Sequence, residues 1–524
     1  MAADWYLIVI IIVMVVALLF CNLYILVYFQ HIDDKNTAYF PKLLVVFGLL
    51  LGEATILLLP LDVANNTTAL GCQEGWNKEC GNLDMELLWL IVFLSIIFII
   101  VVLLPFSIYY YESDDGDDST TGARRFLEAL KMEILTLLFT IALLVILFVT
   151  SSKSKIPMKA TQIFSDSIIS GFHAYIDGST LTNSETANAT SITKVLHVTV
   201  KVSFPIYTIG LASFLGWFGF SIFTGIGLVA LPMDLVLAFV NRPKYISADV
   251  YAHQKLAIQR RSMELIDIGK QIKHGMERPG QHNKSSKERR KQRRVDFITI
   301  NKFKQAVYLL ETDMEDLQLC HEGYKNFNPL IPLFKLFLGC ICSIVSLIWI
   351  LHIALYMLPA TPLLPFLNDY FIWFDSWFPL FGTISIGVFS LFLLACSVKG
   401  CFKFGMRCFC FALHPMELHG TYMNSLLFNL ALVLLCSIPA VQFCDQAFKE
   451  YGRLTAIRTL FGVQIQNLRG MSIFWIYNIF VYAILCISLL SGIFLAIKPK
   501  DKASTLDSIR KKIEQQVREE ANIV

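Results

Sequence analysis

Apolar runs of about 20 residues that carry almost no charge recur along this 524-residue chain. A stretch of this length crosses the hydrocarbon core of a bilayer as a single α-helix. Hydrophobic residues make up 55% of the chain and charged residues only 16%, and the mean hydropathy is +0.58. A soluble fold would have to bury nearly all of this apolar content, with little polar surface to spare. The sequence therefore predicts an all-α fold, a polytopic transmembrane helix bundle.

We predict nine membrane-spanning helices. Their expected bounds are 5–28, 40–63, 87–111, 132–150, 204–230, 333–358, 379–398, 422–444 and 473–497. The first run is too long for a cleaved signal peptide and no basic segment precedes it, so we expect a membrane anchor. The fifth apolar stretch, 198–240, is too long for one span, and Pro205 and Pro232 are its expected ends, with 233–240 as a turn or an interfacial helix. Its glycines predict close helix packing.

The longest water-soluble stretch, 241–328, separates five predicted spans from four. It carries 18 Lys and Arg against 11 Asp and Glu, and apolar residues recur at three- and four-residue steps. This pattern predicts a basic, coiled-coil-like helical hairpin, either packed on itself or bound to a partner. The expected domains are a front bundle (1–240), the hairpin (241–328), a rear bundle (329–500) and a charged cytosolic tail (501–524).

Positive charge predicts the orientation of the bundle, because cationic loops are retained in the cytosol. With 241–328 inside, the inner regions hold 32 Lys and Arg and the outer regions hold 10. The N-terminus is then outside or lumenal and the C-terminus cytosolic. Glycosylation sequons at Asn65, Asn66 and Asn188 fall in predicted outer loops, as glycosylation requires.

Two cysteines, Cys72 and Cys80, lie in the short outer loop between the second and third predicted spans. A disulfide persists in an oxidising compartment, so this pair is a disulfide candidate. Two free thiols are the alternative, and they would require the opposite topology.

Four intramembrane polar residues are candidate functional groups, because buried charge is costly in a bilayer. They are Glu53, Asp62, Asp234 and His352. Glu53 lies mid-span and suits either ion or substrate coupling or a helix–helix hydrogen bond. Asp62 and Asp234 each lie near a proline at a span end, which is typical of interfacial capping. His352 by itself is typical of a core histidine.

Three cysteines at the predicted inner interface, Cys401, Cys408 and Cys410, lie beside basic residues, a setting that suits S-acylation, although a buried hydrophobic role is an alternative. The sequence contains no P-loop, dinucleotide fingerprint, nucleophile elbow or metal ligand set. We therefore expect no catalytic residues, no cofactor, no metal and no nucleic acid partner. The expected partners are membrane lipids and a protein that binds 241–328 or the tail.

Several motifs resemble one family. They are Gln30-His-Ile-Asp-Asp-Lys-Asn-Thr-Ala-Tyr-Phe-Pro-Lys42, Pro60-Leu-Asp-Val-Ala-Asn65, Phe223-Thr-Gly-Ile-Gly-Leu-Val-Ala-Leu-Pro232 with Arg242-Pro-Lys244, and His414-Pro-Met416 with Met423-Asn-Ser-Leu-Leu-Phe-Asn429 and Gln442-Phe-Cys444. This set is similar to the limb-region-1-like membrane proteins, the LIMR family, and resembles its plant and protist branch over most of the chain. The resemblance implies nine spans, an outer N-terminus and a large cytosolic loop after span five.

The same resemblance implies a non-enzymatic membrane receptor or trafficking adaptor in the plasma membrane or the endolysosomal system. It transfers no catalytic residue and no ligand. The alternative is a small-molecule or ion transporter, a channel, or a lipid-moving protein, which would use the polar positions of the bundle and the glycine-rich fifth span.

Overall fold

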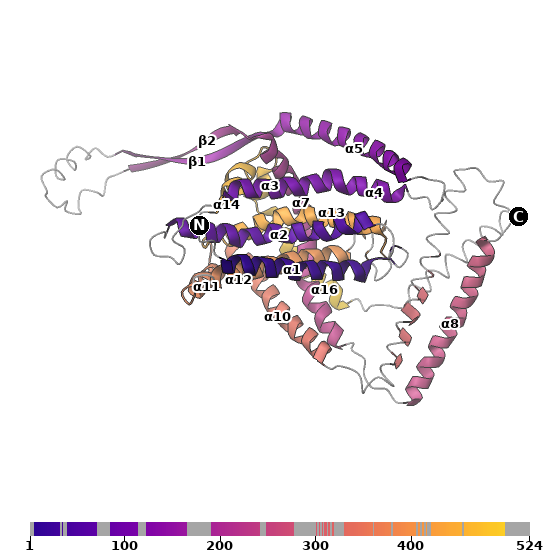
Figure 1. The fold of residues 1–524 in the computed structure, drawn as a ribbon. Coiled ribbons are helices and arrows are strands. Elements are labelled where there is room, and N and C mark those ends of the chain that lie inside the picture. Colours follow the sequence, from indigo (N-terminus) through magenta and orange to yellow (C-terminus); the bar gives the residue numbers. More distant parts are fainter. Residues whose placement is uncertain are drawn as a thin grey trace.

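The computed structural model places the apolar helices side by side in one bundle (Figure 1). The described residues are 5–31, 34, 39–70, 84–113, 122–164, 190–240, 248–276, scattered positions between 300 and 318, 330–359, 361–378, 381–404, 407–408, 411–412, 416, 421–452 and 455–497.

Each predicted span corresponds to an apolar helical segment. The segments are α1 (Trp5–Phe29), α2 (Tyr39–Leu70), α3–η2–α4 (Met85–Glu112), α5 (Gly122–Ser151), α7 (Phe204–Val240), α10–η6 (Leu330–Met357), α12 (Phe381–Phe404), α13 (Met423–Ala447) and α16 (Ile479–Ile497). Within the described residues, eight helices are long and apolar enough to cross a membrane, and α16 contributes a shorter apolar stretch. The predicted all-α, polytopic architecture is confirmed.

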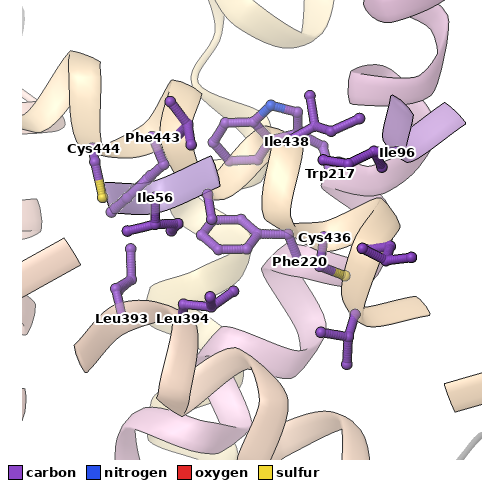
Figure 2. Packing of buried hydrophobic residues seen from close by; sticks show 14 of the residues in the cluster. Ile56, Ile96, Trp217, Phe220, Leu393, Leu394, Cys436, Ile438, Phe443 and Cys444 are labelled. Atoms are coloured by element: carbon purple, nitrogen blue, oxygen red, sulfur yellow. The ribbon is translucent and has the colours of Figure 1, made fainter. Parts of the chain in front are cut away.

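Helix α13 occupies the centre of the bundle and packs against α2, α7 and α12. Its side chains are buried around most of its circumference, as expected for a helix surrounded by other helices. Figure 2 shows Ile438 and Phe443 of α13 beside Trp217 and Phe220 of α7, all four fully buried. The fifth and eighth predicted spans therefore both contribute side chains to the core, together with residues such as Ile56 of α2 and Leu393 of α12.

Glycines allow α7 and α12 to touch backbone to backbone. A Cβ atom on Gly227 would lie 1.7 Å from the carbonyl oxygen of Cys396, and one on Gly400 would lie 1.9 Å from the carbonyl oxygen of Phe223. Only a residue without a side chain fits at these two crossings. The close packing predicted from the glycines of the fifth span is present.

Helix α7 continues through Pro232, where we expected it to end. Its 37 residues give a length of about 55 Å, well beyond the bilayer core. Pro232 is buried, and two residues later Asp234 binds Lys399 and Lys403 of α12, with N–O distances of 3.0 and 2.5 Å. Contacts to neighbouring helices thus hold the last two turns helical in spite of the proline.

A long β-hairpin, which the sequence analysis did not predict, lies at one end of the bundle (Figure 1). Strands β1 (Lys153–Phe164) and β2 (Thr190–Lys201) are antiparallel, and Lys153 pairs with Lys201. The opposite edge of β1 binds a second segment: the N–H of Lys155 donates to the carbonyl of Asn467, and the N–H of Arg469 donates to the carbonyl of Lys153, both at 3.0 Å.

The basic central segment contains α8 (Ala248–Met276), close to the first predicted helix of the hairpin. Described positions between 300 and 318 are also helical, and Ala306 is buried against Leu265 of α8. Figure 1 shows α8 at the end of the bundle opposite β1 and β2.

The segment 446–472, expected to be an outer loop, folds against the bundle. It contains α14 (Ala456–Arg458) and the π-helical η7 (Thr459–Ile465), and α15 (Ser472–Ile476) follows. Ile457, Phe461 and Leu468 are fully buried. Because the chain turns again at Tyr477 and Asn478, the ninth predicted span is wrong as a single helix: only α16 is long.

Candidate functional site

A polar cavity of about 390 Å³ lies where α13 ends and the chain folds back. This volume is within the usual range for small-molecule sites. Its lining comes from the end of α13, from η7 and from the break between α15 and α16. The lining residues are Asp445, Gln446, Lys449, Arg458, Gly462, Gln466, Trp475 and Asn478.

Two side chains bind the last carbonyl group of α13, where this helix ends at the cavity. His352 Nε2 lies 2.9 Å from the carbonyl oxygen of Ala447, and Asn368 Nδ2 donates to the same oxygen at 3.2 Å. The Asn368 side-chain oxygen accepts the N–H of Tyr451 at 3.3 Å. These bonds satisfy backbone groups that a helix leaves unpaired at its C-terminus.

The next helix, α14, begins beside Asp62, a fully buried residue near the C-terminal end of α2. Its carboxylate accepts the N–H groups of Ala456 and Ile457, each at 3.1 Å, and the indole N–H of Trp89 at 2.9 Å. A carboxylate at a helix N-terminus satisfies free N–H groups and is favoured by the helix dipole. Asp62 thereby positions Arg458 at the cavity wall.

Asn478 interrupts the chain between α15 and α16, at a third side of the cavity. Its φ of 49° lies in the left-handed region, which asparagine tolerates better than most residues. Among the described residues it alone, apart from glycine, has a positive φ. This conformation separates α15 from α16 and places Trp475 and Asn478 on the same cavity.

Side chains of both charges line the cavity. Asp445 is only 8% exposed, and its carboxylate accepts the hydroxyl of Thr455 at 3.2 Å. Arg458 donates from Nη1 to the carbonyl oxygen of Lys449 at 2.8 Å, and the Lys449 side chain is exposed. Among the described residues, no ion pair joins Asp445 to Arg458 or Lys449.

Unpaired donors accompany these charges. Within the part of the chain that the structure describes, the buried indole nitrogen of Trp475 has no hydrogen-bond partner, and neither has the side-chain nitrogen of Gln442, one turn before Asp445. The oxygen of Gln442 accepts from Ser213 at 2.7 Å and from Trp217 at 2.8 Å. The rings of Trp217 and Trp475 meet edge to face at 5.0 Å. Buried donors of this kind are costly unless a ligand or water binds them.

The four predicted intramembrane candidates do not form one site. Asp62 and His352 fix the two helix ends described above. Glu53 accepts a hydrogen bond from Asn22 of α1 at 2.8 Å, the helix–helix contact weighed as one alternative. Asp234 is held by the two lysines of α12.

The remaining predicted sites are distributed over the chain. Asn65 is half-buried in the last turns of α2, and Asn66 follows it in the same helix. Cys401 is 1% exposed, and its thiol donates to Asn429 at 3.6 Å, so acylation there would require α12 and α13 to separate. Cys408 lies in β3 (Arg407–Cys408). The other candidates lie outside the described residues: Cys72, Cys80, Asn188 and Cys410.

The sequence analysis did not single out Asp445, Arg458 or Trp475. One signal was available: Gln442 and Asp445 are three residues apart at the end of an apolar run, and Lys449 and Arg458 follow closely. Intramembrane polar pairs of this kind are functional candidates.

Comparisons with known proteins agree with this architecture. The family model for LMBR1-like membrane proteins matches residues 7–296 and 241–493. The chain belongs to the LMBR1-like family. The resemblance found in the sequence motifs is confirmed.

Relatives of this LMBR1-like protein match it over nearly its whole length. A LIMR family protein of Dictyostelium discoideum is 35% identical, covering 93% of this chain and 96% of its own. LIMR family proteins of rice and Arabidopsis thaliana are 31% and 33% identical over 92% and 90% of this chain, and 94% and 92% of theirs. No solved structure matches the chain.

Proposed function

We propose that this LMBR1-like protein is a non-enzymatic membrane receptor or trafficking adaptor. One observation carries the proposal: a polar, ligand-sized cavity is lined by residues of α14 and its neighbours, and α8 protrudes from the opposite end of the bundle. Figure 1 shows α14 and α8 at these two ends. The protein lies in the plasma membrane or in an endolysosomal membrane. The end with β1 and β2 faces the outside or the lumen, and α8 faces the cytosol. The excess of Lys and Arg on the α8 side supports this orientation.

Helix α8 offers the surface for a cytosolic protein partner. Leu256, Met263 and Ile266 are each more than half exposed, whereas Leu265 packs inward against Ala306. Exposed apolar residues on a helix fit an apolar patch on another protein. Arg260 and Arg261 lie one turn or less before Met263, so the partner carries negative charge on that side of the patch.

Site-specific photo-crosslinking in living cells tests this role. A crosslinker in place of Met263 is expected to capture a protein partner, and one in place of Glu264, exposed on α8 but about 100° around the helix, is the matched control. Reversing two neighbouring charges, Arg260→Glu with Arg261→Glu, should weaken the captured band. Equal labelling from positions 263 and 264, or none from either, would contradict the proposal.

A transport role has one observation in its favour. The cavity lies where α13, η7 and α15–α16 are interrupted, and many transporters bind substrates at broken helices. Flux into liposomes containing the full-length protein tests it, with Glu53→Gln as a control outside the cavity. Flux abolished by Arg458→Gln and unaffected by Glu53→Gln would support transport through this site.

A further inference from the structure

The cavity carries opposite charges that lie near each other without forming an ion pair. Asp445 is more than nine-tenths buried, and its hydrogen-bond partner, the Thr455 hydroxyl, is neutral. A buried carboxylate is costly unless a cation compensates it. Arg458 and Lys449 are near enough to attract the carboxylate electrostatically, but neither forms an ion pair with it among the described residues. A ligand cation that enters the cavity can therefore add the direct contact that these two side chains do not make.

The same cavity has donors for an anion. Arg458 uses Nη1 to bind the Lys449 carbonyl, which leaves the rest of the planar guanidinium for another acceptor. Gln466 and Asn478, whose side chains carry amide donors, also line the cavity. The planar guanidinium fork of arginine matches the geometry of a carboxylate.

We propose that this cavity binds a small zwitterion of the amino-acid class. Its ammonium group pairs with Asp445, and its carboxylate pairs with Arg458. Lys449 adds one further positive charge at the exposed side, which suits ligands whose side chain is neutral or acidic. This inference rests on the proposed receptor role, and it names the class of the receptor's ligand.

Binding to the full-length protein in lipid nanodiscs tests the ligand class. The probes are the common L-amino acids, followed by two derivatives of each one that binds: the N-acetyl form, which lacks the ammonium group, and the decarboxylated amine. The readouts are the midpoint of thermal unfolding and equilibrium binding of the radiolabelled compound. At least one amino acid should raise the midpoint, and each derivative should bind at least about tenfold more weakly, since each loses one charge-assisted contact.

Three variants assign the contacts. Arg458→Gln should abolish binding of the free amino acid, and Arg458→Lys should restore it in part. Asp445→Asn should remove the preference for the free amino acid over its N-acetyl form. Arg469→Gln, at an exposed residue outside the cavity, is the matched control. The unliganded unfolding midpoint of each variant separates lost binding from lost folding.

Two results would overturn the inference: no amino acid binds, or the N-acetyl derivative binds the wild-type protein as tightly as the free amino acid. Unchanged affinity in correctly folded Arg458→Gln would also overturn it. If α8 still captures its partner while no amino acid binds, the receptor role stands and the ligand class is wrong. If amino acids bind and α8 captures nothing, the receptor role fails while the site remains.

Discussion

The indole N–H of Trp89 donates a hydrogen bond of 2.9 Å to the carboxylate of Asp62, and both side chains are fully buried. The same carboxylate accepts two N–H groups at the start of α14. One side chain of α2 therefore connects α3 to the segment that lines the cavity.

Replacing this carboxylate should destabilise the bundle strongly. Asp62→Asn places an amide N–H₂ group among three donors, so at least one buried N–H loses its acceptor. We expect the free energy of unfolding to fall by about 2–4 kcal/mol. Denaturation in detergent micelles measures it. Asp84→Asn, at an exposed N-cap that accepts the N–H of Leu87 at 3.1 Å, is the control and should cost far less.

The crossing of α7 and α12 should not tolerate a methyl group. Gly227→Ala forces the two backbones apart, because the new Cβ would meet a carbonyl oxygen at 1.7 Å. We expect a loss of at least about 1–3 kcal/mol in the same denaturation assay. Gly492→Ala on α16 is the matched control, since its Cβ would meet only Val229 at 3.8 Å and alanine favours the helix. Equal stability of the two variants would contradict this account of the crossing.

Low pH should stabilise the contact between α11 (Phe366–Asp375) and α12. Burial raises the pKa of the Asp375 carboxyl, and hydrogen bonds from the Tyr451 hydroxyl and the Gly382 N–H only partly offset this effect. The native state then holds a proton that the unfolded chain has released, so the contribution of Asp375 to stability falls as pH rises through its raised pKa.

Asp375→Asn, which mimics the protonated acid, measures this contribution. The difference in unfolding midpoint between wild type and variant should change as pH rises above about 4, the ordinary pKa of an aspartate, and the wild type should become less stable relative to the variant. A pH-independent difference would show that Asp375 has the same pKa in both states.

Selective permeabilisation tests the orientation of the bundle. Cysteines introduced one at a time as Lys201→Cys in β2 and Lys270→Cys in α8 replace exposed lysines, and their labelling is measured above that of the wild type with its 13 native cysteines. With only the plasma membrane permeabilised, a membrane-impermeant maleimide should label position 270 in either predicted compartment. Position 201 should react from outside intact cells, or only after complete solubilisation if the protein is intracellular. Labelling of position 270 in intact cells would reverse the topology.

The span positions could be predicted from hydropathy because a helix needs about 20 apolar residues to cross a bilayer. Where contacts between helices decide the structure, prediction from local sequence fails. Pro232 indicates a helix end, but burial and the lysines that bind Asp234 keep α7 helical. The cavity was missed for the same reason: Asp445, Arg458 and Trp475 come from three segments that hydropathy treats separately.

The sequence contains a signal for the β-hairpin that the search for apolar runs missed. Residues 190–200 are rich in threonine, isoleucine and valine, which favours a strand. Both strands flank a long polar stretch, however, and the search for apolar runs treated the whole interval as a loop. The bond between β1 and residues 467–469 depends on tertiary folding and has no local signature.

That bond uses main-chain atoms alone, on the edge of β1 opposite β2. Since any residue except proline offers the same N–H and carbonyl groups, the side chains of the hairpin can change without releasing it from the cavity wall. The side chains of the hairpin are thus free to diversify while its position beside η7 is kept by main-chain hydrogen bonds.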